Sequence, residues 1–229
     1  MKRLTTIIRR PSGCLILLFI FLVFGCGTSP SYDTYYPTRQ DSINKQAFIE
    51  RSWRKIREII PIIKNGDLVT RSGNDFTSKS FRSLNQRDQA FSHCGIASIE
   101  NGTVIIYHAL GGDFNPDQKI RRDPIELFAE PSGNIRLGIF RFSVPDSIQQ
   151  NFVEEAKKFY KSAIMFDMDF DLTTNDRMYC AEFIYKTMRR ASDNKLIFNH
   201  SHIKDFEFIG VDDLYLHPLC VRKADLVYK

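Results

Sequence analysis

One cysteine and two histidines in this 229-residue chain are spaced so that they could carry out nucleophilic catalysis. His93 and His108 stand at the far ends of two apolar, β-prone runs, which Glu100-Asn101-Gly102 separates. Asn-Gly between two such runs predicts a β-hairpin with a two-residue turn. Cys180 follows in a segment that can form a helix. A thiolate beside an imidazole that a second polar group orients is the general arrangement for acyl transfer through a covalent intermediate.

The register of this hairpin predicts that the two imidazoles share one face. With Asn101-Gly102 as the turn, His108 faces Gly95 across the hairpin. His93 is the diagonal neighbour of His108, with roughly 7–8 Å between the backbones of the two residues. Gly95 places no side chain beneath His108, which leaves space for a ring. We therefore expect one imidazole to hydrogen-bond the other.

The nucleophile is expected near the beginning of a helix. Thr173–Asp176 offers N-cap residues to a helix that begins near Asn175 and runs through Cys180 to about Arg190. The positive end of the helix dipole favours the thiolate, and the free Cys180 N–H is a candidate oxyanion donor. The alternative is that Cys180 is a small buried hydrophobe, as most lone cysteines are.

Four further residues could bind substrate or complete the oxyanion site: Asp67, Asn74, Ser92 and Tyr179. Glu182, two positions after the nucleophile, is expected to be a structural hydrogen-bonding group. The loop after His108 holds Asp113, Asn115, Asp117 and Asp123 with Arg121 and Arg122, which could line the cleft or simply be solvated.

The remaining cysteines and histidines have simpler interpretations. Cys94 alternates to the face opposite His93, so we expect it in the core, with a disulfide to Cys220 as an alternative in an oxidising compartment. His200-Ser201-His202 lacks the spacing of a metal site, so we expect a solvated loop and no metal ion. The chemistry needs no cofactor.

The N-terminus is typical of a lipoprotein leader. The apolar run from Cys14 to Phe24 is shorter than the roughly 20 residues that span a bilayer, and it has the length of a signal-peptide core. Val23-Phe24-Gly25-Cys26 resembles a bacterial lipobox, in which the cysteine is lipidated. An ordinary signal peptide or an uncleaved anchor is the alternative. Lipidation would hold the domain at the periplasmic side of an inner or outer membrane.

Three segments follow from this interpretation. Residues 1–25 are the expected signal peptide, 26–41 a tether rich in Ser, Thr, Pro, Tyr and Gly, and 42–229 one domain. The net charge of +5 belongs mostly to the leader, which holds four basic residues and no acidic one. Because no concentrated basic face remains, we expect no nucleic-acid partner.

The pattern of the domain predicts an α+β fold with a mostly antiparallel sheet packed against helices. Asp41-Ser42 can cap a first helix that Pro61 stops, and residues 72–90 read as a long loop with one helical turn. The other expected elements are a strand at Ile135–Phe142, an amphipathic helix at Ser147–Tyr160 and strands at Phe206–Val211 and Ala224–Tyr228.

Four short motifs in order resemble the NlpC-type superfamily of papain-like cysteine hydrolases. They are Gly66-Asp67-Leu68-Val69, Ser92-His93-Cys94-Gly95-Ile96, Tyr107-His108-Ala109 and Tyr179-Cys180-Ala181-Glu182. The cysteine follows the histidines, which resembles the circularly permuted branch that includes the YiiX/YaeF-like proteins and lecithin retinol acyltransferase. The resemblance implies a permuted papain-like fold in which helix and hairpin meet. It also implies a Cys180-His93-His108 triad, with Cys180 as nucleophile, His93 as general base and His108 as its orienting group, and hence an ion pair between Cys180 and His93 and a thioester acyl-enzyme. Cys94, where Val or Tyr is usual, and Ala181, where Ser is usual, depart from the pattern.

The resemblance and the leader together predict a cell-envelope amidase or peptidase, with peptidoglycan stem peptides as the substrate at that location. An acyl hydrolase or acyltransferase acting on lipids or N-acyl amino acids is the second hypothesis. A non-catalytic binding module on the same fold is the third.

Overall fold

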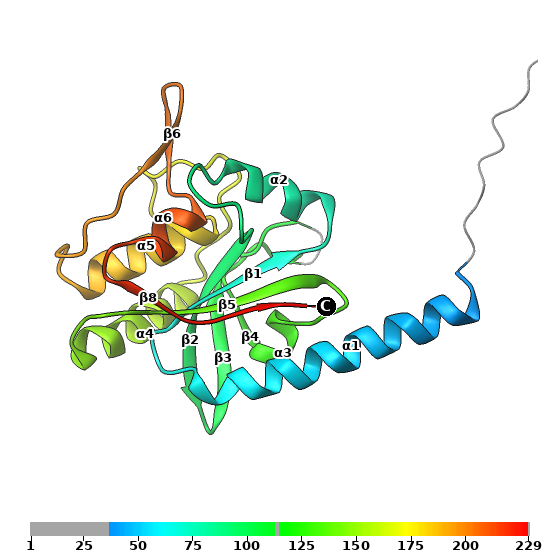
Figure 1. Cartoon of the computed structure of the whole chain (residues 1–229). Coiled ribbons are helices and arrows are strands. Elements are labelled where there is room, and N and C mark those ends of the chain that lie inside the picture. The colour runs from blue at the N-terminus through cyan, green and yellow to red at the C-terminus, as the bar shows by residue number, and fades with distance from the viewer. Residues whose placement is uncertain (1–36, 113–114, 229) are drawn as a thin grey trace, which may run out of the picture. The chain divides into compact units, whose positions relative to one another are not determined.

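The structure is a computed structural model that describes residues 37–112 and 115–228 (Figure 1). Cys26, the leader and most of the expected tether lie outside the described residues. From Thr38 onward the chain forms one compact unit. Its elements are α1 (Arg39–Ile59), η1 (Ile60–Ile62), β1 (Leu68–Gly73), α2 (Phe76–Leu84), β2 (His93–Glu100), β3 (Thr103–His108), β4 (Arg121–Pro124), α3 (Ile125–Phe128), β5 (Asn134–Phe142), α4 (Asp146–Lys161), α5 (Cys180–Ala191), β6 (Ser201–Ile203), β7 (Phe206–Phe208), α6 (Val211–Tyr215) and β8 (Cys220–Val227).

A six-stranded antiparallel sheet in the order β4-β3-β2-β1-β5-β8 forms the centre of the domain. The predicted α+β fold with a mostly antiparallel sheet is confirmed. So is the hairpin register, since Glu100 pairs with Thr103 and Ile96 with Tyr107. The positive φ angles of Asn101 and Gly102, 50° and 80°, are those a tight hairpin turn requires.

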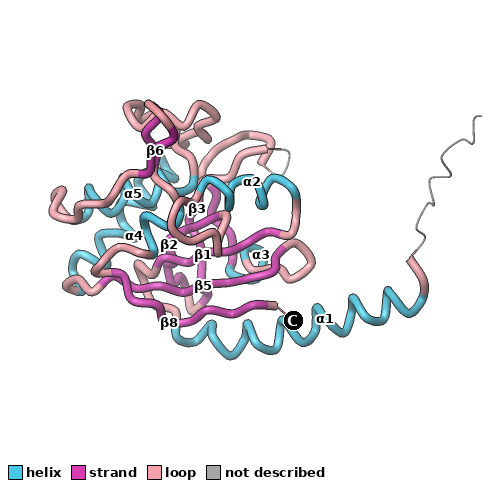
Figure 2. The backbone as a smooth tube through the Cα atoms, turned by 45° about the horizontal axis from the view of Figure 1, so that its top comes forward, coloured by secondary structure: helices cyan, strands magenta, loops and turns pink. Residues whose placement is uncertain are grey.

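Helices cover both faces of the sheet (Figures 1 and 2). The strands alternate, so Cys94 and Ile96 point to the layer of α4, α5 and α6, and Ala97 points to the layer of α1 and α3. The first layer holds the larger, aromatic-rich core. The second is smaller, and α1 extends past the edge of the sheet beside β8. The site residues therefore come from a sheet buried on both sides.

Two predictions for the first half of the domain were wrong, and the strand expected at Phe206–Val211 ends at Phe208, because α6 begins at Val211. The first helix begins at Arg39 rather than near Ser42, because Thr38 is its N-cap and Asp41 completes a capping box from the third helical position. The last residues of the expected tether are thus helical. Residues 72–90 contain a nine-residue helix, α2, which Asp75 caps by accepting a hydrogen bond from the Ser78 N–H at 2.9 Å.

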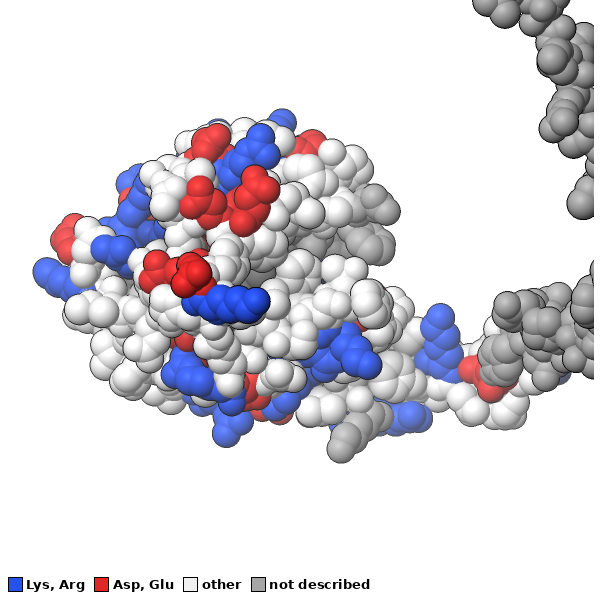
Figure 3. All heavy atoms as spheres, turned by 90° about the horizontal axis from the view of Figure 1, so that it is seen from above, with Lys and Arg blue, Asp and Glu red and all other residues white. Residues whose placement is uncertain are grey.

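No helix of the described part of the chain is long and apolar enough to span a bilayer. Seen from above, from the side of the β6–β7 hairpin, the domain shows basic and acidic side chains interspersed on this face (Figure 3).

Candidate active site

The two histidines of the β2–β3 hairpin form a hydrogen-bonded pair, as predicted. Nε2 of His93 lies 2.8 Å from Nδ1 of His108, and the rings meet edge to face with centroids 5.0 Å apart. Gly95 makes this approach possible. A Cβ on Gly95 would lie 2.4 Å from Cγ2 of Ile106 and 3.1 Å from Cβ of His108. The Phe128 ring packs against both imidazoles from the α3 side.

Asp123 extends the pair into a chain of three polar groups. Its Oδ2 accepts a hydrogen bond from Nε2 of His108 at 3.1 Å, and its carboxylate is held by Arg121 at 2.7 and 2.8 Å. From the sequence, Asp123 was only one of several acidic residues in a loop. The short strand β4 places it opposite Ile106, on the face that carries His108. Arg121–Pro124 is only four residues long and shows no alternation of polar and apolar residues, so the sequence did not identify it as a strand.

This chain of hydrogen bonds determines where the protons lie. The Asp123 carboxylate can only accept, so His108 carries its proton on Nε2 and offers Nδ1 as an acceptor. His93 must then donate from Nε2, which leaves its Nδ1 unprotonated when the ring is neutral. Among the described residues no partner is recorded for that nitrogen. The tautomer that results is the one a general base requires.

Burial keeps both imidazoles neutral. Desolvation lowers the pKa of His108 to about 4, despite the opposing hydrogen bond with Asp123. Burial, with the positive charge of Arg71, places the pKa of His93 well below its ordinary value. Desolvation alone would raise the pKa of Asp123, but hydrogen bonds from His108 and Arg121 outweigh it and hold that pKa far below the usual range. The resting site therefore favours neutral His93 over the imidazolium of the expected ion pair.

Cys180 is the first residue of α5, so the predicted helix start near Asn175 was wrong. Tyr179 is the N-cap, and its N–H donates to the buried Glu182 carboxylate at 3.2 Å. Burial raises the pKa of Glu182 to about 7, although Lys186 pairs with it at 2.8 Å. Glu182 thus has the structural role expected of it, and Cys180 lies where the helix dipole acts most strongly on a thiol.

The Cys180 sulfur lies against the first residues of β2. Cys94 donates a side-chain hydrogen bond to it, which is the largest influence on the pKa of Cys180 and lowers it. Burial opposes this effect, and the N–H groups of Ala181, Cys94 and Cys180 add to it, so the pKa is lower than that of an ordinary thiol. Burial raises the pKa of Cys94, which keeps it a donor. Within the described residues no hydrogen bond is recorded between this sulfur and either imidazole.

The pairing of β2 with β3 explains how a helix on one face reaches the histidines. The two strands are paired only as far as Ile96 and Tyr107, although β2 continues back to His93. The Cys94 N–H is therefore free of β3 and donates to the cysteine of α5. Cys94 lies in the core on the α5 side, as predicted, and Cys94, Cys180 and Cys220 are free thiols.

A small apolar cavity of about 100 Å³ adjoins Cys180. Cys180 and Ser92 lie on its wall with aromatic and aliphatic side chains from α2, the segment before α5, and the β6–β7 hairpin. The apolar lining includes Phe81, Leu84, Phe170, Phe206, Phe208 and Val211. Ile203 and Phe206, both on the hairpin, are 45% and 44% exposed, so the apolar lining continues to the surface.

Of the four residues proposed to bind substrate, two line this cavity and two do not. Tyr179 contributes its ring, but its hydroxyl accepts a hydrogen bond from the Ile209 N–H at 2.7 Å. Ser92 accepts a hydrogen bond from the Gly73 N–H at 3.2 Å. Asn74 is exposed and donates to the Ser132 carbonyl. Asp67 is fully buried in an ion pair with Arg141, so its carboxylate is structural.

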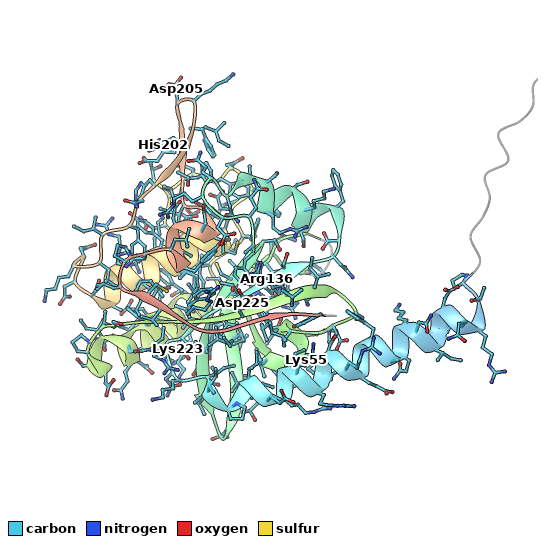
Figure 4. The ribbon with its side chains drawn as sticks, in the orientation of Figure 1. Lys55, Arg136, His202, Asp205, Lys223 and Asp225 are labelled. Carbon is cyan, nitrogen blue, oxygen red and sulfur yellow. The ribbon has the colours of Figure 1, made fainter. Side chains whose placement is uncertain are left out.

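The predicted solvated loop at 200–202 is part of a β-hairpin instead. His200 lies 2.7 Å from Glu207 across the β6–β7 pair, and His202 is close to the tip (Figure 4).

Comparison with known proteins gives a likeness in structure. No protein-family model matches the chain, and no curated protein matches its sequence. A solved structure that resembles it is that of the metalloprotein YiiX from Escherichia coli O157:H7, a DUF1105 protein, with a TM-score of 0.58 and 16% identity. The match covers 72% of this chain and 98% of YiiX. At this identity the likeness concerns the fold alone.

Proposed function

We propose that this domain is a cysteine hydrolase on a circularly permuted, NlpC-type papain-like fold, with Cys180 as nucleophile and His93 as base. The observation that carries the proposal is the continuous chain Asp123–His108–His93, which fixes the base tautomer at the end of β2 where the Cys180 sulfur lies. A merely structural histidine pair would not require a cysteine of lowered pKa at a helix start beside it.

The proposed cycle begins with the thiolate of Cys180, which hydrogen bonds from Cys94 and three N–H groups stabilise. The sulfur attacks an acyl carbonyl, and the N–H of Cys180 is the candidate donor to the oxyanion. The proton of the Cys180 thiol, which His93 takes up on Nδ1 as the thiolate forms, passes to the leaving group when its bond to the acyl carbon breaks, and a thioester remains. His93 then takes a proton from water, which hydrolyses the thioester and restores the thiolate. No step needs a cofactor.

The proposed substrate is an acyl group joined through an amide, with peptidoglycan stem peptides as the first candidate. A specific observation favours the second candidate, an acyl lipid: the cavity beside Cys180 is apolar and opens between exposed Ile203 and Phe206. Hydrolysis and transfer share the same thioester and differ only in the acceptor. With Cys26 lipidated, as we also propose, the domain would act at a bacterial membrane surface.

A metal-dependent function, which the name of YiiX suggests for that protein, does not fit the residues of this site. In the described ranges 37–112 and 115–228, no three His, Cys, Asp or Glu side chains converge to hold a metal ion. Both ring nitrogens of His108 are already hydrogen bonded, and the Asp123 carboxylate is shared by His108 and Arg121. The proposed cycle therefore uses no metal ion.

The test is to incubate the purified protein with muropeptides and, separately, with acyl phospholipids, and to analyse products and protein by mass spectrometry. We expect product release and an acyl adduct on Cys180, both abolished in Cys180→Ala with the circular dichroism spectrum unchanged. Cys220→Ala is the matched control, since Cys220 is a free thiol outside the site, and it should behave as the unmodified protein. Full turnover by Cys180→Ala would refute the proposal.

A further inference from the structure

Arg71 stands out among the arginines of the sheet because it has no carboxylate partner. Five others, on β4, β5 and β8, each pair with an Asp or Glu: Arg121, Arg122, Arg136, Arg141 and Arg222. Figure 4 shows one such pair, Arg136 and Asp225. No carboxylate lies within ion-pair distance of Arg71 in the described part of the chain. Because a charge removed from water is normally paired, this exception calls for a partner.

The Arg71 side chain lies beside the base. Arg71 and His93 are directly paired across β1 and β2, so both side chains leave the same face of the sheet. The Arg71 guanidinium carbon stands 4.9 Å from the centroid of the Phe128 ring, the ring that also packs against His93. Arg71 is only partly buried, which leaves a route from solvent.

The guanidinium has unused hydrogen-bonding capacity. Nη1 donates to the Phe128 carbonyl at 3.1 Å, and no other hydrogen bond of the side chain is recorded. A guanidinium offers five N–H donors in a planar fork that suits a carboxylate. Its charge acts on the carboxylates of Asp123 and Asp75, neither of which is within ion-pair distance. It also acts on Cys180 and on His93, so it lies within electrostatic range of both reacting groups. An anion at this position would complete the pairing found at the other sheet arginines.

We propose that Arg71 is the anion-binding residue of the site and holds a carboxylate of the substrate next to the bond that Cys180 attacks. The fitting substrates are acylated amino acids or peptides with a free carboxylate close to the scissile acyl bond. This assignment rests on the proposed function, because it takes Cys180 as the nucleophile. It narrows the substrate choice within that function to acyl groups whose leaving group bears a negative charge.

Two alkylating agents that differ only in charge test this without turnover. Iodoacetate carries a carboxylate where iodoacetamide carries a carboxamide, and both attack the same Cys180 thiolate. We expect Arg71→Gln to lower the ratio of the iodoacetate to the iodoacetamide rate by about tenfold or more, the scale of one hydrogen bond to a charged group. Arg71→Lys should restore part of the ratio. The adduct is located by mass spectrometry, with Cys180→Ser as background.

Arg222→Gln is the matched control, since Arg222 is an exposed sheet arginine that pairs with Asp225, and its ratio should equal that of the unmodified protein. An unchanged ratio in Arg71→Gln would overturn the proposal. Because both rates report the same thiolate, a shift in thiol pKa cancels. A missing acyl adduct in the turnover experiment would refute the hydrolase function separately, and it would not alter this ratio.

A second measurement uses the unmodified protein, should Arg71→Gln fail to fold. N-decanoylglycine should protect Cys180 from iodoacetamide at about tenfold lower concentration than N-decanoylglycinamide, which lacks the carboxylate. Equal protection by the two, or protection by inorganic phosphate and not by the carboxylate, would overturn the proposal.

Discussion

Lowering the pH from 8 to 5 should remove the stability that the neutral, buried His108 contributes to the folded domain. His108 is 1% exposed, and burial lowers its pKa from 6.5 to about 4 in the folded protein. Between these values the unfolded chain binds a proton that the folded protein does not. Stability therefore falls as the pH drops through 6.5, and the loss is complete below the folded pKa.

The magnitude follows from the two pKa values. At pH 5 the unfolded imidazole is almost fully protonated and the folded one is largely neutral, so His108 alone costs about 2 kcal/mol of unfolding free energy relative to pH 8. His93, whose pKa is lowered by burial and by Arg71, acts in the same direction. The low pKa of Asp123 acts only below the ordinary carboxylate range and leaves this window unaffected. Glu182, whose pKa burial raises to about 7, acts inside the window in the opposite direction, because its folded form binds a proton first. The His108 contribution is therefore obtained by comparing the unmodified protein with His108→Gln.

Urea denaturation at pH 8, 6.5 and 5 measures this loss. His108→Gln should remove about 2 kcal/mol of the difference between pH 8 and pH 5, whatever its stability at pH 8. His202→Gln is the control, because His202 lies on the exposed hairpin with 58% of its side chain accessible. If the unmodified protein and His108→Gln lost equal stability on acidification, the neutral buried pair and the tautomer argument built on it would be refuted.

Two further predictions concern the groups on either side of the pair. Asp123→Asn should lower turnover at least about 100-fold, because an amide can donate to His108 and reverse the tautomers. Steady-state rates measure this loss. Asp117→Asn, at an exposed neighbouring residue, is the control, and equal activity of the two variants would contradict the prediction. Cys94→Ala should raise the thiol pKa of Cys180, because the largest hydrogen bond that stabilises its thiolate is lost. The pH dependence of iodoacetamide alkylation measures this pKa, and Cys94→Ser, which keeps a donor, should retain a lower value. An unchanged pKa in Cys94→Ala would show that the Cys94 thiol is not a donor.

The sequence contained enough information for the local geometry of the histidines. Asn101-Gly102 fixes the hairpin, and strand alternation then sets His93 and His108 on one face with Gly95 beneath them. These inferences succeed because turn chemistry and the two-residue period act over a few residues.

Contacts between segments that lie far apart in the sequence were harder to predict. Asp123 joins the histidines only because a four-residue strand pairs with β3, and such a strand has no periodic signal. The start of α5 was misplaced because Glu182 closes a capping box on Tyr179, whereas the polar residues Thr173–Asp176 form turns of their own. The unpaired state of Arg71 depends on where every carboxylate lies, which no local pattern reveals.

The placement of the sulfur at the junction of β2 and α5 has a consequence for the newly made chain. In an extended polypeptide Cys180 carries an ordinary thiol, since its N–H donors at Cys94 and Ala181 are not yet gathered around it. Strands β2, β3 and β4 can assemble His93, His108 and Asp123 as one meander of adjacent strands. The pKa of the Cys180 thiol falls only when α5 docks on that meander. If the chain crosses a membrane before it folds, as we propose, its Cys180 thiol would resist alkylation and oxidation until the domain has formed.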